Sequence, residues 1–329
     1  MVAIGKKIIV ALITLLFVVT FTFFVIRQMP GDPLYQWAAE IVETTGMSFE
    51  EAYAQVKQMY LYDPDEPLGQ QFTKYVKSLL RGNLGISMTF GISVNEIIIK
   101  ALPWTVLVLS ISLSLSFGLG VFLGMLIAWK RKTILEPIVT GYASFTAATP
   151  DYITALFLLV IFAIGLELFP FRGAYDIAVS PGFNWGFLKS VLYHAALPII
   201  AFTFEGAGGW AMAMKGSAVS VLGEDYIMAA KARGLRDRRI IVSYVGRNAI
   251  LPMVTILAIT FGGMLGGSVL IERVFNYPGI GWWFAYSLMR RDFGMIQGLF
   301  LVTSAAVIFA NLAADILYSK LDPRIKLEG

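Results

Sequence analysis

Few residues of this chain have the types and spacings that catalysis requires. It has no cysteine and one histidine, His194, which excludes thiolate metal sites, histidine metal clusters and a serine-type triad within the chain. No Gly-x-x-x-x-Gly-Lys-Ser/Thr loop is present for nucleotide phosphates, and no pair of carboxylates has a spacing that suggests acid–base work. We therefore expect no catalytic residue, no bound cofactor and no metal, and a membrane enzyme is a poor interpretation.

The most informative stretch is the charged, glycine-bounded segment 223–235. Asp225 suits the first turn of a helix, and Lys231 and Arg233 suit its last turn, because each complements the helix dipole. Gly234 suits the left-handed residue that closes a helix. The sequence predicts a short helix over 224–234, with an apolar stripe for a soluble partner made of Tyr226, Ile227, Ala229 and Ala230. The candidate contact residues are Glu224, Asp225, Tyr226, Ile227, Met228, Ala229, Ala230, Lys231, Arg233 and Gly234.

A second stretch, residues 272–283, combines an acid with turn-forming and aromatic residues. Pro278 and Gly279 force a turn, and Gly281 gives the backbone beyond it more conformational freedom. Trp282 and Trp283 suit a membrane interface. The stretch is a gate loop at the outer end of a pathway, an interfacial anchor, or both. Its candidate residues are Glu272, Phe275, Pro278, Gly279 and Gly281.

Glu205 is the most interesting acid within an apolar segment. A charge there costs ~2.5–3.5 kcal/mol on insertion scales unless it faces a cavity or a partner. It either lines a translocation path or is a paired or protonated structural group. The residue types alone leave both interpretations open.

The composition places these residues in a polytopic membrane protein. Of its residues, 57% are hydrophobic and 15% are charged, whereas a soluble domain carries about 25% charge. The sequence predicts an all-α fold with six transmembrane helices, because apolar runs long enough to span a bilayer occur six times. These runs are Ile8–Ile26, Leu102–Trp129, Ile134–Phe169, Val191–Met214, Ile250–Ile271 and Met295–Tyr318.

Basic residues fix the expected orientation. They gather before the first run, after the second and the sixth, and most of all between the fourth and the fifth, where segment 218–247 lies. By the positive-inside bias, both termini and the 224–234 helix are cytoplasmic. Residues 28–99 then form an extracytoplasmic insertion with helical patches at Ser48–Tyr60 and Leu68–Leu80. Its 28–96 part holds nine acidic and four basic residues.

These residues resemble the permease subunits of binding-protein-dependent ABC importers, in the oligopeptide, dipeptide and nickel branch. Segment 225–235 with Arg247–Pro252 is similar to the branch's cytoplasmic "EAA" loop, although Met228 takes the place of the usual glutamate. The branch's other signatures are Met29–Pro33, Gly82–Gly85, Glu272–Phe275 with Pro278–Gly281, and Leu321–Arg324. Together they extend from residue 29 to residue 324.

The resemblance implies a single type I importer permease domain over residues 1–329 in the cell membrane of a prokaryote. Its partners would be a second homologous permease, two cytoplasmic ATPase chains that carry ATP and magnesium, an extracytoplasmic solute-binding protein and membrane lipid, and no nucleic acid. The 224–234 helix would be a coupling helix that docks on an ATPase. Residues 28–96 and the aromatic loop Phe171–Lys189 would receive the binding protein.

Two alternatives remain at this stage. The cargo is an oligopeptide or a related solute, and the same branch also imports oligosaccharides and nickel complexes, which fold motifs do not distinguish. The second alternative is that the chain is a secondary transporter or channel that acts alone, although it has no string of intramembrane carboxylates for ion coupling. Arg236, Arg238 and Arg239 meet acidic ATPase surface or anionic headgroups, or they only mark topology.

Overall fold

The computed structural model describes residues 2–28, 33–59, 66–130, 132–263 and 267–321, which are helices joined by loops, with one isolated β-bridge between Ile86 and Ser93. Its elements are α1 (Val2–Arg27), α2 (Pro33–Thr45), α3 (Phe49–Met59), α4 (Leu68–Leu80), α5 (Val94–Trp129), α6 (Leu135–Ala148), α7 (Asp151–Leu158), the π-helical η1 (Leu159–Gly165), α8 (Trp185–Leu222), α9 (Asp225–Ala232), α10 (Asp237–Arg239), the π-helical η2 (Ile240–Gly246), α11 (Arg247–Gly263), α12 (Val269–Val274), α13 (Ile280–Arg290) and α14 (Phe293–Leu321). Residues 29–32 and 322–324, within two of the signatures, lie outside the described residues.

Five helical segments of the described chain are long and apolar enough to cross a membrane. The expected third span differs, because α6 and α7–η1 meet at an angle of 104° and count as one span only if it is broken. The break lies at Thr149–Pro150. Proline lacks the N–H that a continuous helix needs and disfavours helical geometry in the preceding residue, and Thr149 is extended at φ −100° and ψ 126°.

Several element boundaries also depart from the sequence prediction. The helical patches at 48–60 and 68–80 are confirmed as α3 and α4, but α2 was not anticipated. The predicted span Ile250–Ile271 is wrong at both ends, since the helix begins at Asp237 and ends near Gly263. The 272–283 stretch, predicted as a loop, contains the end of α12, a turn and the start of α13.

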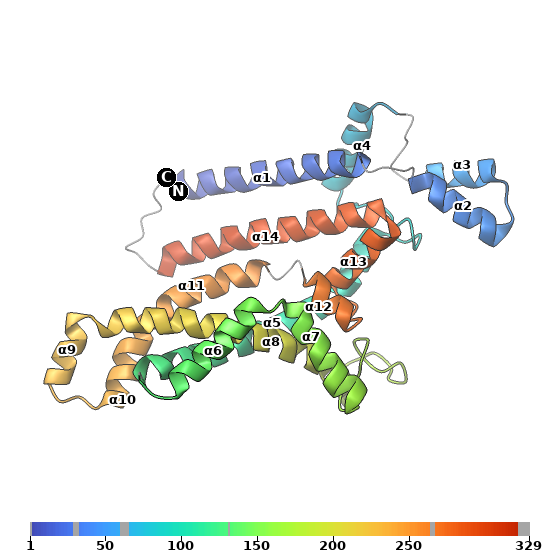
Figure 1. Cartoon of the computed structure of the whole chain (residues 1–329). Coiled ribbons are helices and arrows are strands. Elements are labelled where there is room, and N and C mark those ends of the chain that lie inside the picture. Colours follow the sequence, from blue (N-terminus) through green and yellow to red (C-terminus); the bar gives the residue numbers. More distant parts are fainter. Residues whose placement is uncertain (1, 29–32, 60–65, 131, 264–266, 322–329) are drawn as a thin grey trace.

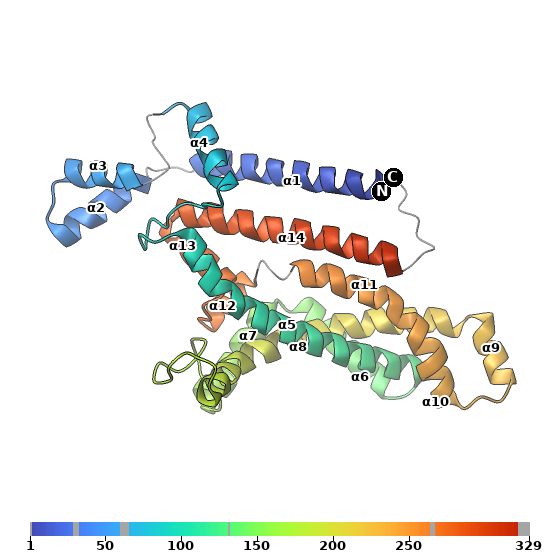
Figure 2. The same cartoon turned by 180° about the vertical axis from the view of Figure 1, so that it is seen from behind.

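The helices place the two candidate stretches at opposite ends of the bundle (Figures 1 and 2). The start of α1, the end of α14, α9 and α10 lie at one end, here called the α9 end. The helices α2, α3, α4 and α13 lie toward the opposite end, here called the α13 end. Helices α1 and α14 run side by side between them.

Helices α5 and α8 form the central pair and run in the same direction. Glycine makes their close approach possible, since it has no Cβ to separate two helices. A Cβ on Gly120 would overlap Trp210 and lie 2.8 Å from the carbonyl oxygen of Ala207. One on Gly124 would overlap the carbonyl oxygen of Ala211 and lie 2.8 Å from the Cβ of Met214. The two helix backbones are therefore in direct contact over more than one turn.

We expect Gly124→Ala to destabilise the folded protein by ~1–3 kcal/mol, the usual cost of overpacking. The added methyl group has only backbone and Cβ atoms to displace. Thermal unfolding of the detergent-purified protein measures the effect. Gly118→Ala on the same helix is the matched control, because its Cβ would meet nothing within 4 Å. Equal unfolding temperatures for the two variants would contradict the packing argument.

Candidate functional site

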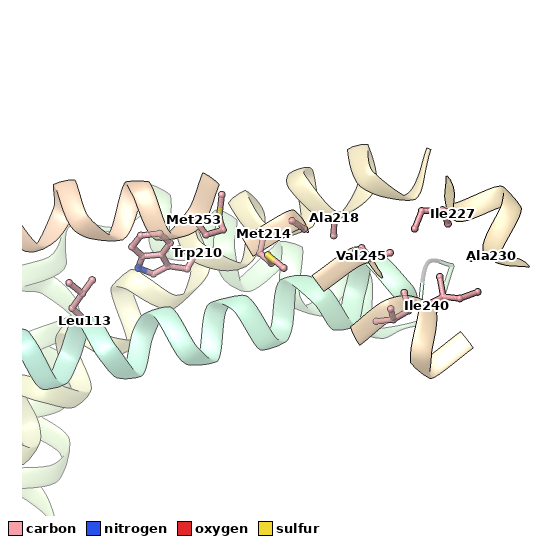
Figure 3. Packing of buried hydrophobic residues seen from close by; sticks show 12 residues of the cluster. Leu113, Trp210, Met214, Ala218, Ile227, Ala230, Ile240, Val245 and Met253 are labelled. Atoms are coloured by element: carbon pink, nitrogen blue, oxygen red, sulfur yellow. The ribbon is translucent and has the colours of Figure 1, made fainter. Parts of the chain in front are cut away.

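Helix α9 is attached to the membrane helices through one apolar face. Ile227 is 0% and Ala230 is 2% exposed. Both belong to a cluster that includes Met214 and Ala218 of α8 and Val245 of η2 (Figure 3). Burial of an isoleucine side chain contributes ~1.5–3 kcal/mol, so a helix of only 8 residues is held in place by its neighbours rather than by its own propensity.

The opposite face of α9 is exposed. Tyr226 is 41% and Met228 is 59% exposed, and Ala229 lies beside them on the surface. The sequence places Tyr226, Ile227, Ala229 and Ala230 on one docking face. The structure corrects this, because Ile227 and Ala230 point into the chain's own core and only the other two remain outside. Glu224, Asp225, Lys231, Arg233 and Gly234 are exposed around them.

Polar contacts reinforce this attachment. The side-chain amide of Asn248 donates to the hydroxyl of Tyr226 at 3.2 Å, and Ser217 donates to the carbonyl oxygen of Ala249 at 2.8 Å. Gly234 has φ +74° and ends the helix in the left-handed conformation that its sequence predicts. Helix α9 thus connects rigidly to both α8 and η2–α11.

At the α13 end, Glu272 is the centre of a buried polar network. Its carboxylate is 3% exposed and accepts hydrogen bonds from the Thr105 hydroxyl at 2.9 Å and the Trp282 N–H at 3.1 Å. The Thr105 oxygen accepts in turn from the Ile280 N–H at 2.8 Å. Because these N–H groups belong to the first turn of α13, the acid is stabilised by a helix N-terminus. The network joins α5, α12 and α13.

Glycine is required where these segments meet. A Cβ on Gly279 would overlap both the Glu272 carboxylate and the Thr105 hydroxyl. A Cβ on Gly281 would lie 2.7 Å from the carbonyl group of Ser268. Pro278 is half-buried beside this turn, and Phe275 is 2% exposed and packs in a cluster with Leu197 of α8. The five predicted residues of this stretch are therefore brought together.

Burial sets the protonation of Glu272, which lies between the candidate spans Asp237–Phe261 and Phe293–Ala313. Loss of solvent raises the pKa of its carboxyl group to about 7, against the lowering effect of hydrogen bonds from Thr105 and from backbone N–H groups. Thr105 was missed from the sequence, where its only signal is a hydroxyl near the start of an apolar span.

Glu205 lies on α8, away from both networks. Its Oε1 atom is buried and makes no hydrogen bond within the part of the chain that the structure describes, as is true of the Thr154 and Thr203 hydroxyls. Thr154 and Asp151 of α7 are its polar neighbours, just after the break at Pro150. The candidate pathway acid is therefore beside α7, just after the 104° bend.

Comparison with known proteins identifies the family. A family model described as the inner membrane component of binding-protein-dependent transport systems matches residues 120–327. The chain belongs to this family. It is 31% identical to the oligopeptide transport system permease protein of Haemophilus influenzae over 98% of each chain. It is 31% identical to the dipeptide transport system permease protein of Escherichia coli (strain K12) over 93% of each, and 28% identical to an oligopeptide transport system permease protein of Bacillus subtilis over 95% of each.

The resemblance inferred from the motifs is thus confirmed. This permease is a multi-pass protein of the bacterial inner membrane and a transport subunit without a catalytic domain. An α9 with one exposed face, Glu272 at the other end of the bundle, and Glu205 between them on α8 are the features of the permease that its function has to explain.

We expect the Glu272 carboxyl group to make the permease less stable as pH rises. Its folded pKa is above the ordinary value, so its favourable contribution is present at low pH and is lost as pH rises from about 4.5 to about 7. The unfolding temperature of the wild type minus that of Glu272→Gln should therefore be smaller at pH 8 than at pH 5, because only the wild type loses this contribution as pH rises. Glu96→Gln, at an exposed Glu96–Lys100 pair, is the control. A difference that stays constant with pH would refute this assignment.

Proposed function

We propose that this permease forms half of the translocation pathway of an ATP-driven peptide importer and that α9 is its coupling helix. The whole chain acts as one membrane domain, with residues 28–99 as an insertion and 218–247 as the coupling loop. A second homologous permease completes the pathway. Two separate ATPase chains bind ATP and magnesium and hydrolyse the ATP, because this chain has no phosphate-binding loop of its own.

The two-faced burial of α9 carries the proposal. Ile227 and Ala230 attach the helix to α8 and η2, while Tyr226, Met228 and Ala229 remain outside. An exposed apolar face rimmed by charged residues is typical of a protein interface. A force applied to this face would move α8 and α11 together, because α9 packs against α8 and η2, its Tyr226 accepts a hydrogen bond from Asn248 of α11, and Ser217 of α8 bonds directly to Ala249 of α11.

Charge and the arrangement of the helices support a definite orientation in the membrane. The α9 end holds Lys6, Lys7 and the basic residues of 231–247, and the positive-inside bias places such an end in the cytoplasm. The start of α1 and the end of α14 lie at this end, which supports cytoplasmic termini. The α13 end, with α2–α4 and the loop after η1, is then extracytoplasmic and receives the solute-binding protein.

The α12–α13 segment serves as the outer gate. Its residues Glu272, Phe275, Pro278, Gly279 and Gly281 belong to one packed unit attached to α5. Glu205 lines the pathway, since its buried Oε1 makes no hydrogen bond within normal distance among the described residues, where Thr154 is a polar neighbour. Such a group is costly in an apolar environment unless a cavity or partner satisfies it.

Peptides are the favoured cargo. The named relatives are oligopeptide or dipeptide permeases along nearly their whole length, and none of those three carries a sugar or a metal in its name. Dependence on a binding protein is part of the family description, which disfavours a transporter or channel that acts alone.

Met228→Glu combined with Ala229→Glu should lower the amount of ATPase that copurifies with the permease by roughly tenfold, a loss of about 1.4 kcal/mol in binding. Both residues are exposed, so the permease itself should fold normally, and the new charges would be desolvated in the interface. The measurement is quantitative copurification of the assembled importer in mild detergent.

Ile134→Glu is the matched control for this experiment. Ile134 is 73% exposed and precedes α6, so the substitution adds a negative charge to an exposed surface outside α9. If both sets of variants retain the ATPase equally, α9 is not the coupling helix.

The cargo prediction is tested on the cognate binding protein. Mass spectrometry of the ligand that it retains on purification should detect short peptides. Oligosaccharides or a metal complex in place of peptides would overturn this part of the proposal and leave the assignment of α9 intact.

A further inference from the structure

Helix α13 is followed by a second buried carboxylate, that of Asp292. This residue is 1% exposed and lies between Arg291, in the left-handed conformation at φ 54°, and the first residue of α14. It accepts hydrogen bonds from the Ser87 hydroxyl and from the backbone N–H groups of Met88, Thr89 and Met295, the last three at 3.0 Å. One of these donors caps α14, whereas the other three come from the loop before α5.

This loop also packs along α13. The ring of Phe90 lies 5.2 Å from that of Trp283 and 5.4 Å from that of Tyr286, measured between centroids. A Cβ on Gly294 would overlap the carbonyl oxygen of Ile86. The loop 86–90 and the corner between α13 and α14 are therefore in direct backbone contact and share a desolvated carboxylate.

The α2–α3 hairpin rests on the same two segments. Leu34, Ala38, Ala52 and Val56, all 0% exposed, form one apolar cluster with Met88 of the loop and with Phe293 and Ile296 of α14. The Met88 N–H donates a hydrogen bond to Asp292, and Phe293 is the residue that follows Asp292 in the chain. The hairpin thus contacts the bundle at the residues that flank the Asp292 network.

We propose that Asp292 is a positioning residue that makes α13 move together with the α2–α3 hairpin, so that docking of the binding protein on the hairpin reaches the outer gate. This inference rests on the proposed function and specifies how its extracytoplasmic partner acts. Helix α13 is attached to the loop and hairpin at its C-terminal end by Asp292 and to α5 at its N-terminal end by Glu272. A rigid helix held at both ends by buried networks transmits displacement, because neither end can shift without exposing unpaired polar groups.

A simple cap of α14 would not need this arrangement. A cap of α14 requires only that one carboxylate oxygen accept a hydrogen bond from the Met295 N–H. A solvent-exposed acidic residue could do this equally well. Three further donors from residues 87–89, almost fully removed from water, are explained if the two segments have to remain together while the gate changes conformation.

The test uses the complete importer, reconstituted in vesicles with its two permeases and its ATPase chains. Its ATPase rate is measured alone and across a titration of the cognate binding protein, purified with its retained ligand. Asp292→Asn replaces one acceptor oxygen by a donor group that faces N–H and O–H donors. Ser87→Ala removes the hydroxyl that donates to Asp292 and accepts from the Phe90 N–H at 3.2 Å, and it keeps the carboxylate with three backbone partners.

We expect both variants to keep the basal ATPase rate and the half-saturating concentration of the binding protein. The maximal stimulation should fall by roughly fivefold or more in Asp292→Asn, the lower end of typical coupling factors, and by less in Ser87→Ala. Glu96→Gln is the control at the α13 end, because Glu96 is exposed and its side chain bonds, within the described part of the chain, only to its helical neighbour Lys100. It should leave the titration unchanged.

Each other outcome decides against the inference. Full stimulation in both variants would show that Asp292 does not transmit docking. A higher half-saturating concentration with full maximal stimulation would show that it only shapes the docking surface. If Asp292→Asn fails to assemble, a Ser87→Ala titration identical to wild type overturns the proposal. A wild-type complex that the binding protein does not stimulate would instead refute the proposed function itself.

Discussion

The close approach of α5 and α8 is the constraint on which both ends of the bundle depend. Gly120 and Gly124 bring the two backbones into contact at Ala207 and Ala211. Toward one end, the same α8 continues to Met214 and Ala218, which support Ile227 of α9. Toward the other end, α5 presents Thr105 to Glu272. A change in the spacing of this pair would therefore displace α9 and the α12–α13 segment together.

Buried polar groups at the α13 end follow a common rule. Glu272 and Asp292 are almost fully removed from water, and no arginine or lysine of the described residues donates a hydrogen bond to either carboxylate. Backbone N–H groups and hydroxyls supply the compensation instead. Such donors belong to helix ends and loops, so each carboxylate specifies how several segments meet and a single ion pair could not replace it.

Local signals allowed much of the fold to be predicted. Long apolar runs located the membrane helices, and Asp225, Lys231 and Gly234 marked the beginning and end of α9. What failed depended on tertiary contacts. The position of η2 decides which apolar residues of α9 are buried and which are exposed. The spacing of apolar residues within α9 does not indicate where η2 lies. Thr105 and Asp292 act through partners 167 and 205 residues away in the chain, and no local pattern predicts such pairs.

The break at Thr149–Pro150 was visible in the sequence as a proline, but its angle was not. A proline within an apolar run is compatible with a mild kink as well as with a sharp turn. The observed 104° turn brings α7 beside Glu205, so a residue read as an isolated intramembrane acid acquires a polar neighbourhood.

The division of α9 into an inner and an outer face has a consequence for how its variants should be interpreted. Substitutions at Ile227 and Ala230 act on the packing of the chain itself, so they reduce the number of intact molecules. Substitutions at Met228 and Ala229, which are exposed, leave that number unchanged and, if α9 has the proposed coupling role, reduce what each molecule does. Adjacent residues on one short helix, such as Ile227 and Met228, would thus have the same phenotype in a growth assay for different reasons. Only protein abundance measured beside activity separates them.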